Sequence, residues 1–156
     1  MRSFFQWLLS SVGKKYLLAG TGLALVGFTV THLAANLTLL VGDGGTLFNT
    51  YPHQLQKWGP LLIAAEMVLL GLFLLHLALA VAVTVVARRA RGTVGHPPRS
   101  KGGASHFSWA SRGMILSGLA ILVFLVVHIL HFKFGPAEAQ GYITDIQGEP
   151  ARDLYR

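Results

Sequence analysis

Three histidines are placed to do chemistry, because each lies deep inside a long apolar stretch: His32, His76 and His128. An imidazole is costly in hydrocarbon, so a histidine within a membrane span is a functional hypothesis by default. Neutral imidazole is a common metal ligand, and axial histidine is a frequent way to hold haem iron. We therefore expect the membrane part of this chain to bind haem. The structural alternative is that each histidine only forms a hydrogen bond between helices.

The depth of each histidine in its span decides which of them can meet. A helix rises ~1.5 Å per residue, so His32, 17 residues beyond the lysine pair before its span, lies roughly 25 Å from that end. His128 is 16 residues beyond Arg112, or roughly 24 Å from the same side. His76 precedes Arg88 by 12 residues, or roughly 18 Å. We expect His32 and His128 to share one site and His76 to belong to a second.

Three apolar stretches are long enough to hold these histidines in a membrane: about 16–41, 58–87 and 109–132. Each exceeds the ~20 residues that cross a bilayer as a helix, and continuous apolar runs of this length are not typical of strands. Only 12% of the residues are charged, against roughly 25% in a soluble domain. We predict an all-α integral membrane fold, with 1–134 as the membrane part and 135–156 as a polar tail.

Basic residues mark one side of the membrane. Nine of the 13 Lys and Arg lie before the first span, between the second and third spans, or at the start of the third. The positive-inside rule places this side and the N-terminus in the cytoplasm, and the connection 42–57 and the tail outside. Residues 2–9 are expected to form a short interfacial helix. Topology and lipid therefore explain the net charge of +7, and we expect no nucleic-acid partner.

The absence of cysteine limits the possible cofactors. It excludes disulfides, iron–sulfur clusters, thiolate metal sites and covalent haem attachment through CxxCH within this sequence. A metal or haem held by the chain must therefore be bound by other side chains, and the histidines are the leading candidates.

Five further residues have possible roles near the spans. Glu66 is the only acid within a span, where a carboxylate relays protons, bonds a quinol or forms a structural hydrogen bond. His53 either lines a quinone pocket or is a plain surface histidine. Ser111 and Arg112 are candidates for binding haem propionates, although Arg112 equally fits a charge that sets topology. His131 lies near the face of the first histidine in its span and is the alternative ligand there.

The order and spacing of these segments resemble those of a known family, the single-anchor cytochrome b subunit of succinate dehydrogenase and fumarate reductase. The resemblance covers nearly the whole chain and is strongest in the first span. It rests on the following segments: SSVGKKYLLAGTGL at 10–23, THLAANL at 31–37, Glu66 with Leu75-His76, Ser111-Arg112, Ser117-Gly118, and VHILHF at 127–132.

This resemblance implies a five-helix haem-binding bundle in a prokaryotic cell membrane, with two b haems stacked across it. His32 and His128 would ligate the distal haem, and His76 the proximal haem. The sequence covers three of the five helices, and the other two would bring the second ligand of the proximal haem. Further sequence or another chain would supply them, or His76 would have a different partner. Either one haem or two is therefore expected here.

The resemblance also implies partners and a function. A flavoprotein and an iron–sulfur subunit would dock on the cytoplasmic face, and electrons would pass between the iron–sulfur subunit and a quinone, often menaquinone. Succinate chemistry would belong to the flavoprotein rather than to this chain. Two alternatives stay open: a stand-alone di-haem b-type membrane reductase, and a haem-free membrane scaffold subunit.

Overall fold

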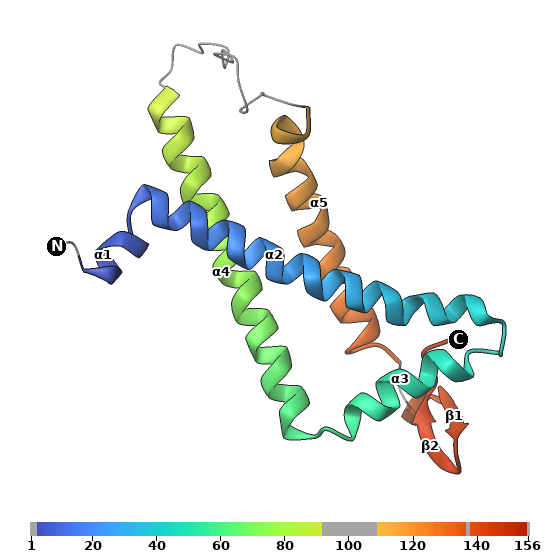
Figure 1. Cartoon of the computed structure of the whole chain (residues 1–156). Coiled ribbons are helices and arrows are strands. Elements are labelled where there is room, and N and C mark those ends of the chain that lie inside the picture. The colour runs from blue at the N-terminus through green and yellow to red at the C-terminus, as the bar shows by residue number, and fades with distance from the viewer. Residues whose placement is uncertain (1–2, 92–108, 137, 156) are drawn as a thin grey trace.

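The structure is a computed structural model that describes residues 3–91, 109–136 and 138–155. Most of the described chain is helical, and a small hairpin follows the last long helix (Figure 1). The elements in chain order are α1 (Phe4–Leu8), α2 (Ser11–Asn36), the 3-10 turn η1 (Leu37–Val41), α3 (Thr46–Gln56), α4 (Pro60–Arg91), α5 (Trp109–Phe132), the 3-10 turn η2 (Glu138–Gln140), β1 (Ile143–Ile146) and β2 (Glu149–Arg152).

Three described helical segments are long and apolar enough to cross a membrane: Ser11–Val41, Pro60–Ala90 and Gly113–Phe132. This confirms the three predicted spans and indicates a membrane-embedded protein. The helix of the first span, α2, begins earlier than predicted, because the Ser10 hydroxyl accepts the Gly13 N–H at 3.1 Å and so caps the start of α2. The second continues past the predicted end, because arginine is a good helix former. The five-helix bundle stays a prediction.

The long helices bury little of their apolar surface against one another. α2 packs mainly on α4, with α5 as the third long helix (Figure 1). Among the described residues of these helices, Leu79 is the buried large apolar side chain, whereas most other Leu, Ile, Val and Phe side chains are exposed. Hydrocarbon does not drive apolar faces together as water does. A large apolar surface on the long helices is therefore left for lipid or neighbouring helices to cover.

The connection 42–57 contains a helix of its own, α3. Both carboxylate oxygens of Asp43 cap this helix: Oδ1 accepts the Gly45 N–H at 3.1 Å and Oδ2 accepts the Leu47 N–H at 2.8 Å. Gly45 has φ +85°, and a Cβ there would overlap the Tyr155 ring. Glycine thus lets the C-terminal tail lie directly against the start of α3.

The tail contains a β-hairpin, which departs from the predicted all-α fold. β1 and β2 are antiparallel, with Ile143 opposite Arg152 and Ile146 opposite Glu149. Gln147 and Gly148 have φ of +57° and +85°, as the two central residues of a type I′ turn require. The physical reason for the departure is this turn, which reverses the chain so that the two short strands pair.

The hairpin docks on α3, and we call α3 with residues 141–155 the α3–hairpin unit. Ile146 and Ala151 are buried at its centre, and so is Asn49. The Asn49 amide donates to Asp153 Oδ1 at 2.8 Å, and its carbonyl oxygen accepts the Leu154 N–H at 2.9 Å. A buried asparagine with both ends bonded fixes the path of the tail.

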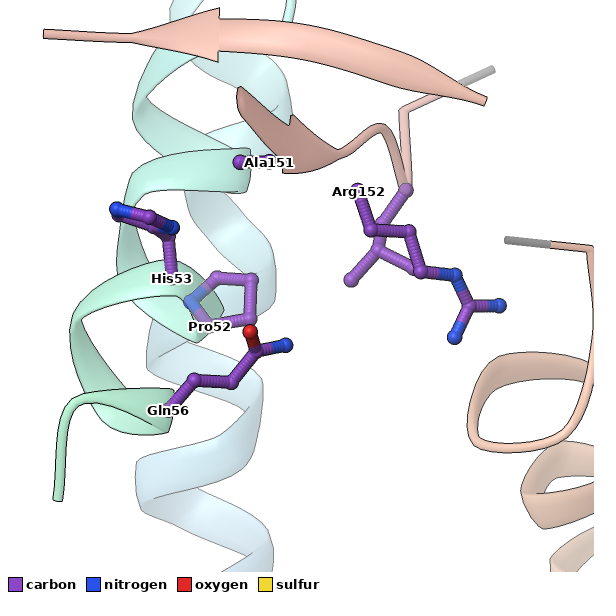
Figure 2. Close-up of a pocket in the computed structure, with 6 residues that line it drawn as sticks. Pro52, His53, Gln56, Ala151 and Arg152 are labelled. Atoms are coloured by element: carbon purple, nitrogen blue, oxygen red, sulfur yellow. The ribbon is translucent and has the colours of Figure 1, made fainter. Parts of the chain in front are cut away.

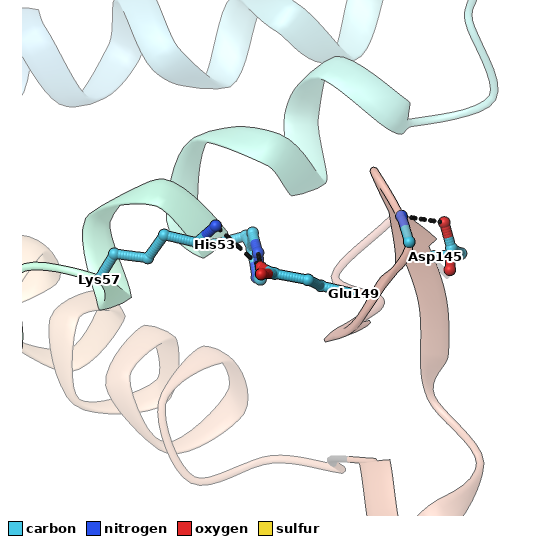
Figure 3. A network of polar contacts seen from close by, with 5 residues as sticks. His53, Lys57, Asp145 and Glu149 are labelled. Carbon is cyan, nitrogen blue, oxygen red and sulfur yellow. Dashed lines mark hydrogen bonds and ion pairs between the residues drawn. The ribbon is translucent and has the colours of Figure 1, made fainter.

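Glu149 links the hairpin to the end of α3. Its Oε2 lies 2.8 Å from Lys57 Nζ and 2.9 Å from His53 Nε2 (Figure 3). The hydrogen bond from Lys57, with a smaller contribution from His53, holds the pKa of the Glu149 carboxyl below its ordinary value. The carboxylate is the form that the docked hairpin favours.

We predict that acid loosens the hairpin. Because the folded pKa of Glu149 is depressed, its contribution is fully present above the ordinary value of 4.5 and is lost as pH falls through the lower folded value. Hydrogen exchange of the β2 amides, corrected for intrinsic rates, should show steady protection from pH 7 to 5 and a fall below about pH 4.5. Glu149→Gln should weaken protection modestly at pH 7 and remove the step. If the fall in protection below about pH 4.5 is unchanged in Glu149→Gln, another acid such as Asp153 causes it.

Candidate functional site

The structure brings His32 of α2 and His128 of α5 together. Their ring centroids lie 5.8 Å apart, with an angle of 88° between the ring planes. His32 is exposed and His128 is half-buried. The two helices therefore place both imidazoles at one level, as their sequence depths predicted.

Phenyl rings flank this imidazole pair. Phe28 stacks on His32 at 5.4 Å and Phe124 stacks on His128 at 5.4 Å, each from one turn earlier in the same helix. Phe132, one turn later, lies 4.8 Å from His128. These rings give the imidazoles an apolar surrounding that disfavours water and suits a flat hydrophobic ligand.

The separation of the rings fits two ligands on one metal. A metal–imidazole nitrogen bond is ~2.0–2.1 Å, so two imidazoles on opposite sides of one ion have centroids roughly 6 Å apart. Within the described residues no group of three or more His, Cys, Asp and Glu is placed to hold a metal ion. Structural zinc needs four protein ligands, whereas haem needs only axial ones because the porphyrin supplies the rest. The donor set therefore fits haem better than zinc.

His76 occupies a different place, where α4 meets α2. Its Nδ1 lies 3.0 Å from Thr21 Oγ1. The Thr21 hydroxyl also lies 2.8 Å from the Leu17 carbonyl oxygen, to which it donates its one proton. Thr21 Oγ1 therefore accepts from His76 Nδ1–H, which assigns the tautomer in which Nε2 keeps its lone pair.

Both readings of His76 use this hydrogen bond. It is an interhelical bond, as the structural alternative predicted, and it also orients the ring as a ligating histidine requires. Gly22 makes room for the ring, because a Cβ there would lie 3.1 Å from His76 Cε1. The ring contacts of the described residues join His32 to His128 but do not bring His76 to either.

Three other predicted residues are placed differently. The ring contact of His131 in the described chain is with Phe132 at 5.2 Å, so the structure does not pair it with His32. Ser111 and Arg112 fall within α5, but their side chains lie outside the described residues. Their role towards haem propionates stays a prediction.

Glu66 has a partner just past the end of α5. Its Oε2 pairs with Lys133 Nζ, which follows the end of α5. About half of each side chain is exposed. The ion pair provides the structural bond to a neighbouring helix that was one of the two roles expected for Glu66, and it leaves the quinone or proton role a prediction.

His53 lines a shallow hollow in the α3–hairpin unit. The hollow is open to solvent and is also lined by Pro52, Gln56, Ala151, Arg152 and Leu154 (Figure 2). Sites for small molecules are concave and bury most of the ligand surface. The hydrogen bond of His53 to Glu149 thus gives it a structural role, and the quinone role has no enclosed pocket here to support it.

Sequence reasoning missed Thr21 and Lys133. The signal for Thr21 was present, since a hydroxyl between two glycines in an apolar helix lets another helix approach a hydrogen-bonding group. The signal for Lys133 was weaker, because a lysine just past a span also fits a topology-setting charge.

No protein-family model, no curated protein and no solved structure matches this chain. The residues and their geometry are accordingly the basis on which a function can be proposed.

Proposed function

We propose that the chain is a haem b-binding membrane anchor of a succinate:quinone oxidoreductase, embedded in a prokaryotic cell membrane with its basic end in the cytoplasm. The observation that carries the proposal is the His32–His128 pair, 5.8 Å apart between two apolar helices. The sequence resemblance supplies the complex to which such an anchor belongs.

The chain's own residues would act mainly by binding and orienting. His32 and His128 would ligate iron from two helices, and the flanking phenyl rings would exclude water and lower the local polarity. A bound haem supplies one-electron transfer, with a potential set by its axial ligands and surroundings. Succinate oxidation would take place in the flavoprotein.

His76 suits a second haem site completed by another helix. Thr21 holds Nδ1–H, so Nε2 is free to ligate. A second imidazole from beyond this sequence would complete the site. Lys133, which donates to Glu66 just past the end of α5, would be a hydrogen-bond donor for a quinone carbonyl.

The basic end suits a docking role. It holds nine Lys and Arg and none of the six Asp and Glu, which favours an acidic face of a soluble partner. A haem-free scaffold is the second candidate, because the Thr21–His76 bond alone would satisfy that histidine.

We predict that His32→Ala and His128→Ala each remove the same haem, because both imidazoles would hold it. Reduced-minus-oxidised spectra and pyridine haemochrome counts on the purified complex should each show one haem fewer than in wild type. His131→Ala is the matched control and should keep that haem, as should His76→Ala. If His131→Ala loses this haem and His128→Ala keeps it, the ligand on α5 is His131 rather than His128. A colourless wild-type complex would favour the scaffold.

We predict that Thr21→Val weakens haem binding at His76 roughly 10–100-fold, as loss of an orienting partner does at other histidine sites. Valine keeps the shape of threonine but accepts no hydrogen bond. Thr21→Ser is the control and should stay near wild type, and the His32–His128 site should be unchanged in both. Haem titration into the haem-depleted complex measures each affinity. Equal affinity in wild type and Thr21→Val would assign Thr21 a purely packing role.

A further inference from the structure

Aromatic rings gather where the chain enters its first span. Phe4 stacks on Trp7 with 6.2 Å between centroids, and Trp7 lies 6.0 Å from Tyr16 of α2. These rings are not covered, since Phe4 is 67% exposed, Phe5 75% and Tyr16 66%. The chain thus presents an exposed aromatic surface on α1 and the early part of α2, which we call the entry cluster: Phe4, Phe5, Trp7 and Tyr16.

A tight turn fixes the entry cluster against α2. The Ser10 hydroxyl donates to the Trp7 carbonyl at 2.6 Å and accepts the Gly13 N–H at 3.1 Å. A Cβ at Gly13 would overlap the carbonyl oxygens of Trp7 and Leu8, so the two helices approach more closely than other residues permit. Figure 1 shows α1 turning off the axis of α2. The cluster is therefore held beside the start of the span.

Two unneutralised lysines adjoin the entry cluster. Lys14 and Lys15 lie in the first turns of α2, and neither has an ion-pair partner within the described part of the chain. The sequence offers no acid before Asp43. The positive charge at this end is accordingly left for a partner outside the chain.

Position along the span identifies that partner as lipid. Because α2 runs from Ser11 directly into apolar sequence, the entry cluster lies where the helix leaves the hydrocarbon. Trp and Tyr concentrate at this level of a bilayer, where a ring is half in apolar surroundings. Lysines at the same level attract anionic headgroups.

We propose that Phe4–Tyr16 is an interfacial anchor that inserts the entry cluster at the headgroup boundary and binds anionic phospholipid through Lys14 and Lys15. This proposal is independent of haem binding. It assigns α1 to the membrane surface and gives the basic end a preference for acidic lipid.

The test uses the full chain with Trp58→Phe and Trp109→Phe, so that Trp7 is the one tryptophan and its emission can be excited selectively. The chain is reconstituted in phosphatidylcholine, with or without phosphatidylglycerol, and lipids brominated at different acyl depths act as quenchers. We expect blue-shifted Trp7 emission, strongest quenching by shallow bromines and little quenching by aqueous acrylamide. Brominated phosphatidylglycerol should quench more than brominated phosphatidylcholine at equal mole fraction, and Lys14→Gln with Lys15→Gln should abolish that difference.

The control is Lys57→Gln, a lysine that directly follows α3 in the connection between the first two spans, and it should leave the Trp7 signal unchanged. Acrylamide quenching without bromine quenching would place Trp7 in water and overturn the proposal. Protection from both quenchers would mean that protein covers the cluster, which also overturns it. Equal quenching by the two brominated lipids in the wild-type background would overturn the anionic preference.

Discussion

The contact of His76 with Thr21 and Gly22 is the interaction on which the arrangement of the long helices depends. Apolar helices in hydrocarbon have no strong preference for packing through one face over another. A hydrogen bond between two helices selects the faces that carry its donor and acceptor. Thr21 accepts from His76 at 3.0 Å, and Gly22 lets the ring approach. The bond therefore fixes which face of α2 meets α4. His32 lies 11 residues on, about three helical turns and roughly 16 Å, so it projects from nearly the same face.

The sequence was sufficient to predict features that depend on a residue's position along a helix. It predicted few of the contacts between residues of different elements. Depth is linear in residue number, so the three spans and the meeting of His32 with His128 followed directly. The partners of Glu66 and Glu149 did not follow, because a cation distant in sequence supplies each. The hairpin was missed because Gln147 takes a positive φ that Asn or Gly usually marks, so no turn signal stood out.

Charge divides the molecule into two unlike ends. At the α3 end, acids and bases neutralise one another within the chain, through Glu66 with Lys133 and Glu149 with Lys57. At the opposite end the sequence holds no acid, so the cations there have no carboxylate of their own. Ion pairs within the chain stabilise the fold only modestly where they are exposed to solvent. Unpaired charges contribute instead to attraction at a distance, towards lipid headgroups or an acidic protein face.

The position of the imidazole pair within its helices bears on its electrostatics. His32 lies four residues before the end of α2 and His128 four before the end of α5, where the helix dipoles place partial negative charge. That partial charge would favour a positively charged group held between the two imidazoles. Arg152 opposes it, because its guanidinium donates to the Phe132 carbonyl at 2.8 Å and brings a full positive charge to the end of α5. The docked hairpin thus offsets the negative end of the α5 dipole one turn past His128, and the tail acts electrostatically on an imidazole pair that it does not contact through that bond.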